Sequence, residues 1–177
     1  MFKRWRNSHG FGVHSPFGYQ LVERVIKCPK DYAYYAYADI DRCCRREHYP
    51  QSIASEAKML LRLVCFLKPQ SFYLPPDSGK MFQLALKKSN SNLRIVRNPA
   101  KADSCDIIAT CGNDIPIDTL KDYISCPGKS ILLKDVPESW SESLFETMKE
   151  GIMIRGKKNT ILISRPEMQK ISYQMYI

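Results

Sequence analysis

The chain has 177 residues, 44% of them hydrophobic, and a formal net charge of +9, so it is a basic protein that needs no disulfide or metal to stabilise its core. Its longest apolar stretch, residues 59–67, is interrupted by Arg62 and is too short to span a membrane. Because residues 1–10 also lack the apolar core of a secretory leader, we expect a single cytoplasmic domain over residues 1–177.

The first predicted element is a helix that begins within the motif HGFGVHSPF at residues 9–17. Ser15 is placed to cap this helix, and Pro16 is placed in its first turn. A tyrosine-rich stretch and a short basic helix over residues 39–47 follow. We expect residues 1–54 to form a helical arm or cap.

Residues 55–177 are predicted to form an α/β core, because short apolar strands alternate with amphipathic helices. The predicted helices cover residues 55–67, 81–88, 119–124 and 138–150, and the predicted strands cover residues 71–74, 93–97, 105–110, 130–134, 152–155 and 160–164. This alternation implies a mostly parallel sheet with right-handed crossovers. The last two strands flank a short turn and are predicted to form an antiparallel hairpin.

The connection between the second and third predicted strands is unusually short. Only about seven residues separate Arg97 from Cys105, too few for a crossover helix. Either a whole strand–helix unit is absent there or the connection is irregular.

The loop after the first strand, residues 75–79, lies where a nucleotide cofactor contacts the backbone in parallel α/β domains. Glycines in such a loop let the chain turn with positive φ and approach the ligand closely. This loop instead has Pro75 and Pro76, and proline fixes φ and lacks the N–H that would face a ligand. Only Gly79 remains, so we predict a cofactor-binding architecture that has lost its ordinary cofactor site.

Four parts of the sequence carry a resemblance to a known family. They are HGFGVHSPFGYQLVERVI, LLRLVCFLKP, the pair CDIIATCGND and ILLKDVPESWSESLFETMK, and RPEMQKISYQMYI. With these segments the chain resembles the class I S-adenosylmethionine-dependent methyltransferases, in particular a bacterial branch that begins with an HGxGxHSPF-like signature. The resemblance implies a truncated Rossmann-like methyltransferase fold, S-adenosylmethionine as cofactor and methyl transfer as activity.

The resemblance also implies where the cofactor would lie. The acidic residues and glycines with which the family holds its cofactor fall here at Leu74, Pro76, about Lys80, Arg97, Cys111 and Lys134. These replacements remove carboxylate acceptors and add positive charge near a sulfonium, which weakens cofactor binding. The positions that could still bind the cofactor are Asp77, Ser78, Gly79, Gly112, Asn113 and Asp135. Asp77 also suits a turn and Asp135 also suits the cap of the following helix, and no catalytic residue can be assigned.

Three functions are compatible with this sequence. The first is a methyltransferase-like protein that is catalytically weak or inactive and has a binding or regulatory role, with a protein partner or as a homo-oligomer. The second is an active methyltransferase on a small acceptor, with a rearranged pocket that uses Asp77 or Asp135. The third is an adaptor that binds nucleic acid or another polyanion through Arg42, Arg45, Arg46, Lys87, Lys88 and Arg94, although no recognition motif is present.

The sequence predicts no metal site. Its seven cysteines form no C-x-x-C pair, and its three histidines have no carboxylate or thiol at ligand spacing. The cysteines are therefore expected to be small core residues.

Overall fold

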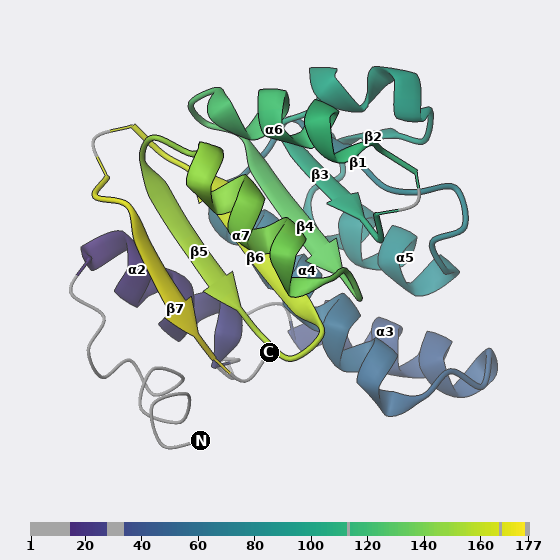
Figure 1. Cartoon of the computed structure of the whole chain (residues 1–177). Helices are drawn as coiled ribbons and strands as arrows, with labels where there is room; N and C mark the ends of the chain where they lie inside the picture. The colour runs from purple at the N-terminus through teal and green to yellow at the C-terminus, as the bar shows by residue number, and fades with distance from the viewer. Residues whose placement is uncertain (1–14, 28–33, 113, 167, 176–177) are drawn as a thin grey trace. The chain divides into compact units, whose positions relative to one another are not determined.

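The computed structural model describes residues 15–27, 34–112, 114–166 and 168–175 (Figure 1). The chain divides into two compact units. The α/β unit contains residues 71–76 and the described residues from 94 to 175, and the helical unit contains the described residues from 15 to 70 and residues 77–93. No helix in the described ranges is long and apolar enough to cross a membrane.

The helical unit begins with a short helix whose start was predicted. Its elements are α2 (Pro16–Leu21), the π-helix η1 (Val22–Ile26), α3 (Tyr34–Arg46), α4 (Gln51–Leu67) and α5 (Lys80–Ser89). The Ser15 hydroxyl accepts a hydrogen bond from the Gly18 N–H at 3.2 Å, and Pro16 occupies the first turn, which confirms the predicted cap. α4 ends where Lys68 adopts a left-handed conformation directly before Pro69.

Helix α3 begins five residues earlier than predicted. Ala36, Ile40 and the pair Cys43 and Cys44 recur at helical spacing and are buried, so they extend the apolar stripe toward the N-terminus. This stripe packs in one cluster with residues of α4 and α5, among them Leu61. The cysteines of α3 are core residues, as predicted, but Cys111 and Cys126 are exposed, so the prediction was wrong for these two.

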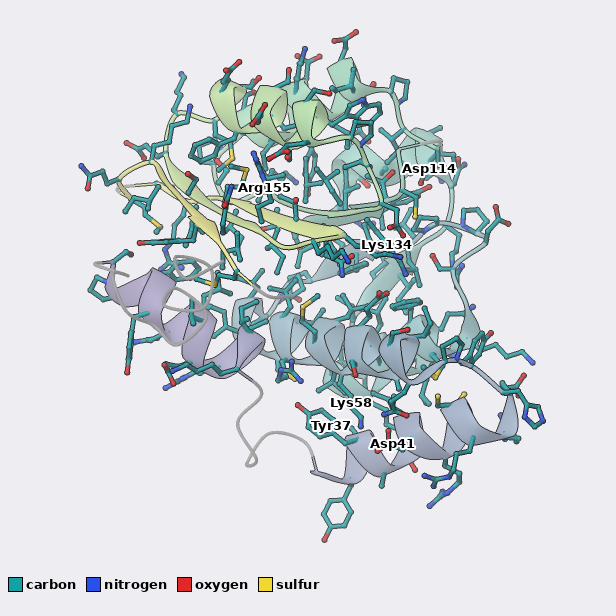
Figure 2. All side chains as sticks on the ribbon, turned by 60° about the horizontal axis from the view of Figure 1, so that its bottom comes forward. Tyr37, Asp41, Lys58, Asp114, Lys134 and Arg155 are labelled. Carbon is teal, nitrogen blue, oxygen red and sulfur yellow. The ribbon has the colours of Figure 1, made fainter. Side chains whose placement is uncertain are left out.

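Polar contacts also join α3 to α4, as Figure 2 shows for Tyr37, Asp41 and Lys58. The Lys58 ammonium lies 2.6 Å from the Asp41 carboxylate and 5.5 Å from the centre of the Tyr37 ring. Arg62, one turn further along α4, is only 5% exposed and donates to the backbone oxygen of Val25 at 2.6 Å.

The α/β unit is built on one sheet of seven described strands. The strands are β1 (Ser71–Tyr73), β2 (Arg94–Val96), β3 (Ile107–Thr110), β4 (Ser130–Lys134), β5 (Gly151–Arg155), β6 (Asn159–Ser164) and β7 (Ile171–Gln174), and the helices are the 3₁₀ helix η2 (Pro99–Ser104), α6 (Ile117–Ser125) and α7 (Glu138–Thr147). The strand order is β2-β1-β3-β4-β6-β5-β7. Only β6 runs antiparallel to its neighbours. This confirms the predicted α/β fold, a mostly parallel sheet of Rossmann-like type with an antiparallel hairpin.

The short connection between β2 and β3 is the 3₁₀ helix η2. The Asn98 side chain caps it by accepting a hydrogen bond from the Ala100 N–H at 3.0 Å. In the sheet, β1 lies between β2 and β3 and pairs with both. Along the chain, η2 is the one element that connects β2 to β3, and residues 97–106 are all described.

A row of buried side chains crosses the sheet beneath α6 and α7. Cross-strand pairing aligns Tyr73, Ile108, Ile131, Leu162 and Met153, one from each of five strands, and all belong to one core cluster with residues of both helices. Figure 1 shows α7 in front of this part of the sheet. β7, which the sequence pattern did not predict, continues the same row beyond the core.

Candidate functional site

The candidate site is the edge of the α/β unit where four strands end together. β1, β2, β3 and β4 pair in parallel, so their carboxyl ends lie at one edge. In open α/β sheets, ligands bind outside this edge. The described residues that follow the four strands are 74–76, 97, 111, 112, 114 and 135, and Lys134 is the last residue of β4.

The loop after β1 is held by an arginine from the end of β2. Nη1 of Arg97 donates to the carbonyl oxygen of Pro75 at 2.8 Å and to that of Pro76 at 3.0 Å. Leu74, where the resemblance implied an acidic residue, is 3% exposed, and its N–H bonds to the Val96 carbonyl at 3.0 Å. A buried apolar side chain and a cation therefore occupy two positions where the resemblance implied carboxylates.

The loop after β3 folds around the carboxylate of Asp114. The Tyr73 hydroxyl donates to Asp114 Oδ2 at 2.7 Å, and the Thr110 hydroxyl donates to Asp114 Oδ1. The Gly112 N–H in turn donates to Thr110 Oγ1 at 2.9 Å. Burial and the neighbouring Asp114 carboxylate both raise the pKa of Tyr73, against the smaller opposing effect of Arg97. Asp114 is thus bound by two protein hydroxyls.

Gly112 is required by the packing of its own loop. Its φ of +86° disfavours any residue with a side chain. A Cβ atom there would lie 3.2 Å from Val136 and 3.4 Å from Trp140. The space beside this glycine is therefore filled by one side chain of α7 and one of the segment that precedes it. Asn113, the neighbouring predicted cofactor residue, lies outside the described residues.

Asp135 does not cap α7, so that prediction was wrong. The N-cap of α7 is Pro137, which has no side-chain cap. Asp135 has a φ of +52°, and its N–H bonds to the Lys158 carbonyl at 2.7 Å, so its backbone continues the β4–β6 pairing. Its half-exposed carboxylate lies 3.9 Å from the Lys158 ammonium.

The other three predicted cofactor residues belong to the helical unit. Asp77 is exposed and lies in a turn, where the sequence also placed it, and Ser78 follows it. Gly79 precedes α5 as its N-cap, and a Cβ atom there would lie 3.2 Å from the Tyr49 hydroxyl. The close approach of Tyr49 therefore accounts for a residue without a side chain at position 79.

The basic residues predicted to bind a polyanion are interspersed with acids. In the helical unit, Asp39 pairs with Lys88 at 2.5 Å and Arg42 at 3.4 Å, and Glu47 pairs with Lys80 at 3.2 Å and Arg46 at 3.1 Å. Lys88 lowers the pKa of Asp39, and Lys80 lowers that of Glu47. Arg94 belongs to the α/β unit instead.

Sequence reasoning missed Tyr73, Thr110 and Asp114. The strand pattern marks Tyr73 and Thr110 only as strand residues, and the sole signal was an acidic residue four positions after Thr110. Within the described residues, no group of three or more His, Cys, Asp or Glu side chains could hold a metal ion. No protein-family model, curated protein or solved structure matches the chain.

Proposed function

We propose that this chain is a methyltransferase-like protein that does not hold S-adenosylmethionine in the family's manner and acts by binding a partner. The observation that carries the proposal is the contact of Arg97 with the carbonyl oxygens of Pro75 and Pro76.

The donor set at this edge does not fit the cofactor. Ribose hydroxyls are held by groups that accept hydrogen bonds, whereas a guanidinium such as that of Arg97 only donates. Asp114 already accepts bonds from two hydroxyls, and Asp135 lies beside the Lys158 ammonium. The cationic sulfonium would also be repelled by Arg97. We expect the lack of a free acceptor and the repulsion by Arg97 each to weaken cofactor binding by about 3 kcal/mol. Together they would lower the affinity by roughly four orders of magnitude.

Calorimetry with S-adenosylmethionine and with its demethylated product tests the proposal. We expect no binding by the wild-type chain in the micromolar range. Micromolar binding of either nucleoside to the wild-type chain would overturn the proposal.

A transfer assay separates this proposal from the active-enzyme alternative. The chain would be incubated with cofactor carrying a labelled methyl group and with a broad set of small acceptors. We expect no labelled product. Turnover that is lost in Asp135→Ala would establish an enzyme with a rearranged pocket.

A further inference from the structure

A hollow of about 330 Å³ lies in the α/β unit between α7 and strands β5 and β7. Cavities of roughly 300–1,000 Å³ are typical of small-molecule sites. Its lining combines Glu142, Phe145 and Glu146 of α7 with Met153 and Arg155 of β5 and with residues of β7. None of these residues belongs to the candidate cofactor edge.

The hollow exists because β7 extends the sheet beyond the core beneath α7. Cross-strand pairing places Ser172 beside Met153 and Gln174 beside Arg155, on the face that α7 covers. Met153 is 4% exposed and belongs to the core cluster, whereas Ser172 and Gln174 are exposed. The floor is therefore apolar on its β5 side and open to water on its β7 side.

The charge of the hollow is opposite to that of the chain. Arg155, which Figure 2 shows between α7 and the strands, pairs through Nη1 with Glu138 and with Glu142, the latter at 3.3 Å. Two carboxylates thus surround one guanidinium whose side chain is 12% exposed. Glu146, one helical turn beyond Glu142, adds a further exposed carboxylate. Counted with Glu138 and with Lys170, which lies over Phe145, three carboxylates of α7 face two cations, so the charged groups in and beside the hollow sum to −1 in a chain of net charge +9.

The aromatic wall of the hollow already attracts a cation. The Lys170 ammonium lies 4.9 Å from the centre of the Phe145 ring and donates to the Glu146 carbonyl oxygen at 2.9 Å. Cations are stabilised over aromatic rings at such distances. The end of the hollow near Phe145 and Glu146 therefore already holds one positive charge, that of Lys170.

We infer that this hollow binds a small organic cation, with its ammonium group near the carboxylates of Glu142 and Glu146 and its apolar body against Phe145 and Met153. An anion of the same shape is repelled by the carboxylates, and a neutral molecule gains only the apolar contact. The inference is independent of the proposed function, because it concerns a different part of the α/β unit.

Three probes of one shape test the inference: benzylamine, benzyl alcohol and benzoate. Binding is measured by amide chemical-shift changes in NMR spectra of the full chain at physiological salt. We expect saturable shifts from benzylamine at residues 142–146, 153–155 and 172–174, with an affinity about fivefold above that of benzyl alcohol. Benzoate is expected to give no saturable shifts. Equal affinities for the three probes, or no saturable shift with benzylamine, would overturn the inference.

Variants locate the site and its charge. Glu146→Gln is expected to weaken benzylamine about fivefold and to leave benzyl alcohol unchanged. Asp118→Asn, on α6 and 88% exposed, changes the net charge equally and is expected to leave both affinities unchanged. Ser172→Trp is expected to fill the hollow and abolish binding of both probes. Undiminished benzylamine binding by Glu146→Gln would contradict the assigned role of the carboxylate.

Discussion

The hydroxyl of Tyr73 lies 2.7 Å from Oδ2 of Asp114, so a side chain of β1 is bonded to the loop that follows β3. These residues are 41 positions apart in sequence. Both lie at the edge where a parallel sheet of this type binds ligands. Here the edge uses its aspartate to stabilise its own loop.

Tyr73→Phe removes this bond and leaves the Thr110 hydroxyl as the one described donor to the Asp114 carboxylate. Because the donor site is buried, we expect the free energy of unfolding to fall by about 1–2 kcal/mol. Urea denaturation measures the change. Tyr19→Phe, at a 50% exposed tyrosine, is the matched control and is expected to stay within about 0.5 kcal/mol of wild type. Equal effects of the two variants would show that the bond contributes no stability.

The same tyrosine predicts a loss of stability at alkaline pH. Burial raises the pKa of Tyr73 and also that of Tyr123, so the folded chain keeps both protons where the unfolded chain releases them. An unfolded tyrosine titrates at about pH 10, so this stability is complete below that value and is lost as the pH rises above it. We expect the loss to be smaller in Tyr73→Phe. Parallel pH profiles for wild type and variant would contradict this prediction.

Arg62 is expected to be a major contributor to the stability of the helical unit. Its Nε donates to the Val25 carbonyl at 2.6 Å, and its Nη1 donates to the Tyr37 hydroxyl at 3.1 Å. Arg62→Met keeps the chain length but leaves a buried carbonyl without this donor, so we expect a loss of about 2–4 kcal/mol. Thermal and urea unfolding measure it. A loss below about 0.5 kcal/mol would show that water replaces the guanidinium.

Arg155 is expected to behave differently, although it is also largely buried. Its partners Glu138 and Glu142 have side chains that are 64% and 57% exposed, and its buried Nε has no hydrogen-bond partner among the described residues. The ion pairs gain little in water, and the unpaired Nε costs free energy. We therefore expect Arg155→Met to change the free energy of unfolding by no more than about 1 kcal/mol. A loss as large as that of Arg62→Met would refute this distinction.

Much of the fold could be predicted because the periodic spacing of apolar residues and the residues typical of turns can both be recognised within a short stretch of sequence. β4 has the predicted bounds, and the hairpin of β5 and β6 follows from its turn. β7 was missed because Ile171–Gln174 is short, follows a proline-containing segment and buries only one of its four side chains. A strand at a sheet edge with so little burial has almost no periodic signal.

The contacts of the candidate site could be predicted only in part. The substitutions at Leu74, Pro76 and Arg97 identified an altered loop, but the bond from Arg97 to the proline carbonyls depends on the pairing of β1 with β2. The cap expected of Asp135 was wrong because strand pairing, rather than the following helix, determines its backbone conformation. Contacts that depend on the pairing of strands distant in sequence cannot be predicted from the spacing of residues within one segment.

The six-residue η2 between β2 and β3 also bears on the order of folding. A chain segment that joins two strands without an intervening crossover helix closes a shorter loop, and the entropy lost on closure grows with loop length. β1 lies between β2 and β3 in the sheet, and its pairs Ser71–Arg94 and Phe72–Ile107 join residues far apart in sequence, so this saving applies only to the step from β2 to β3. We therefore expect this short connection to lower the entropy cost of placing β3 beside β1 once β1 and β2 have paired.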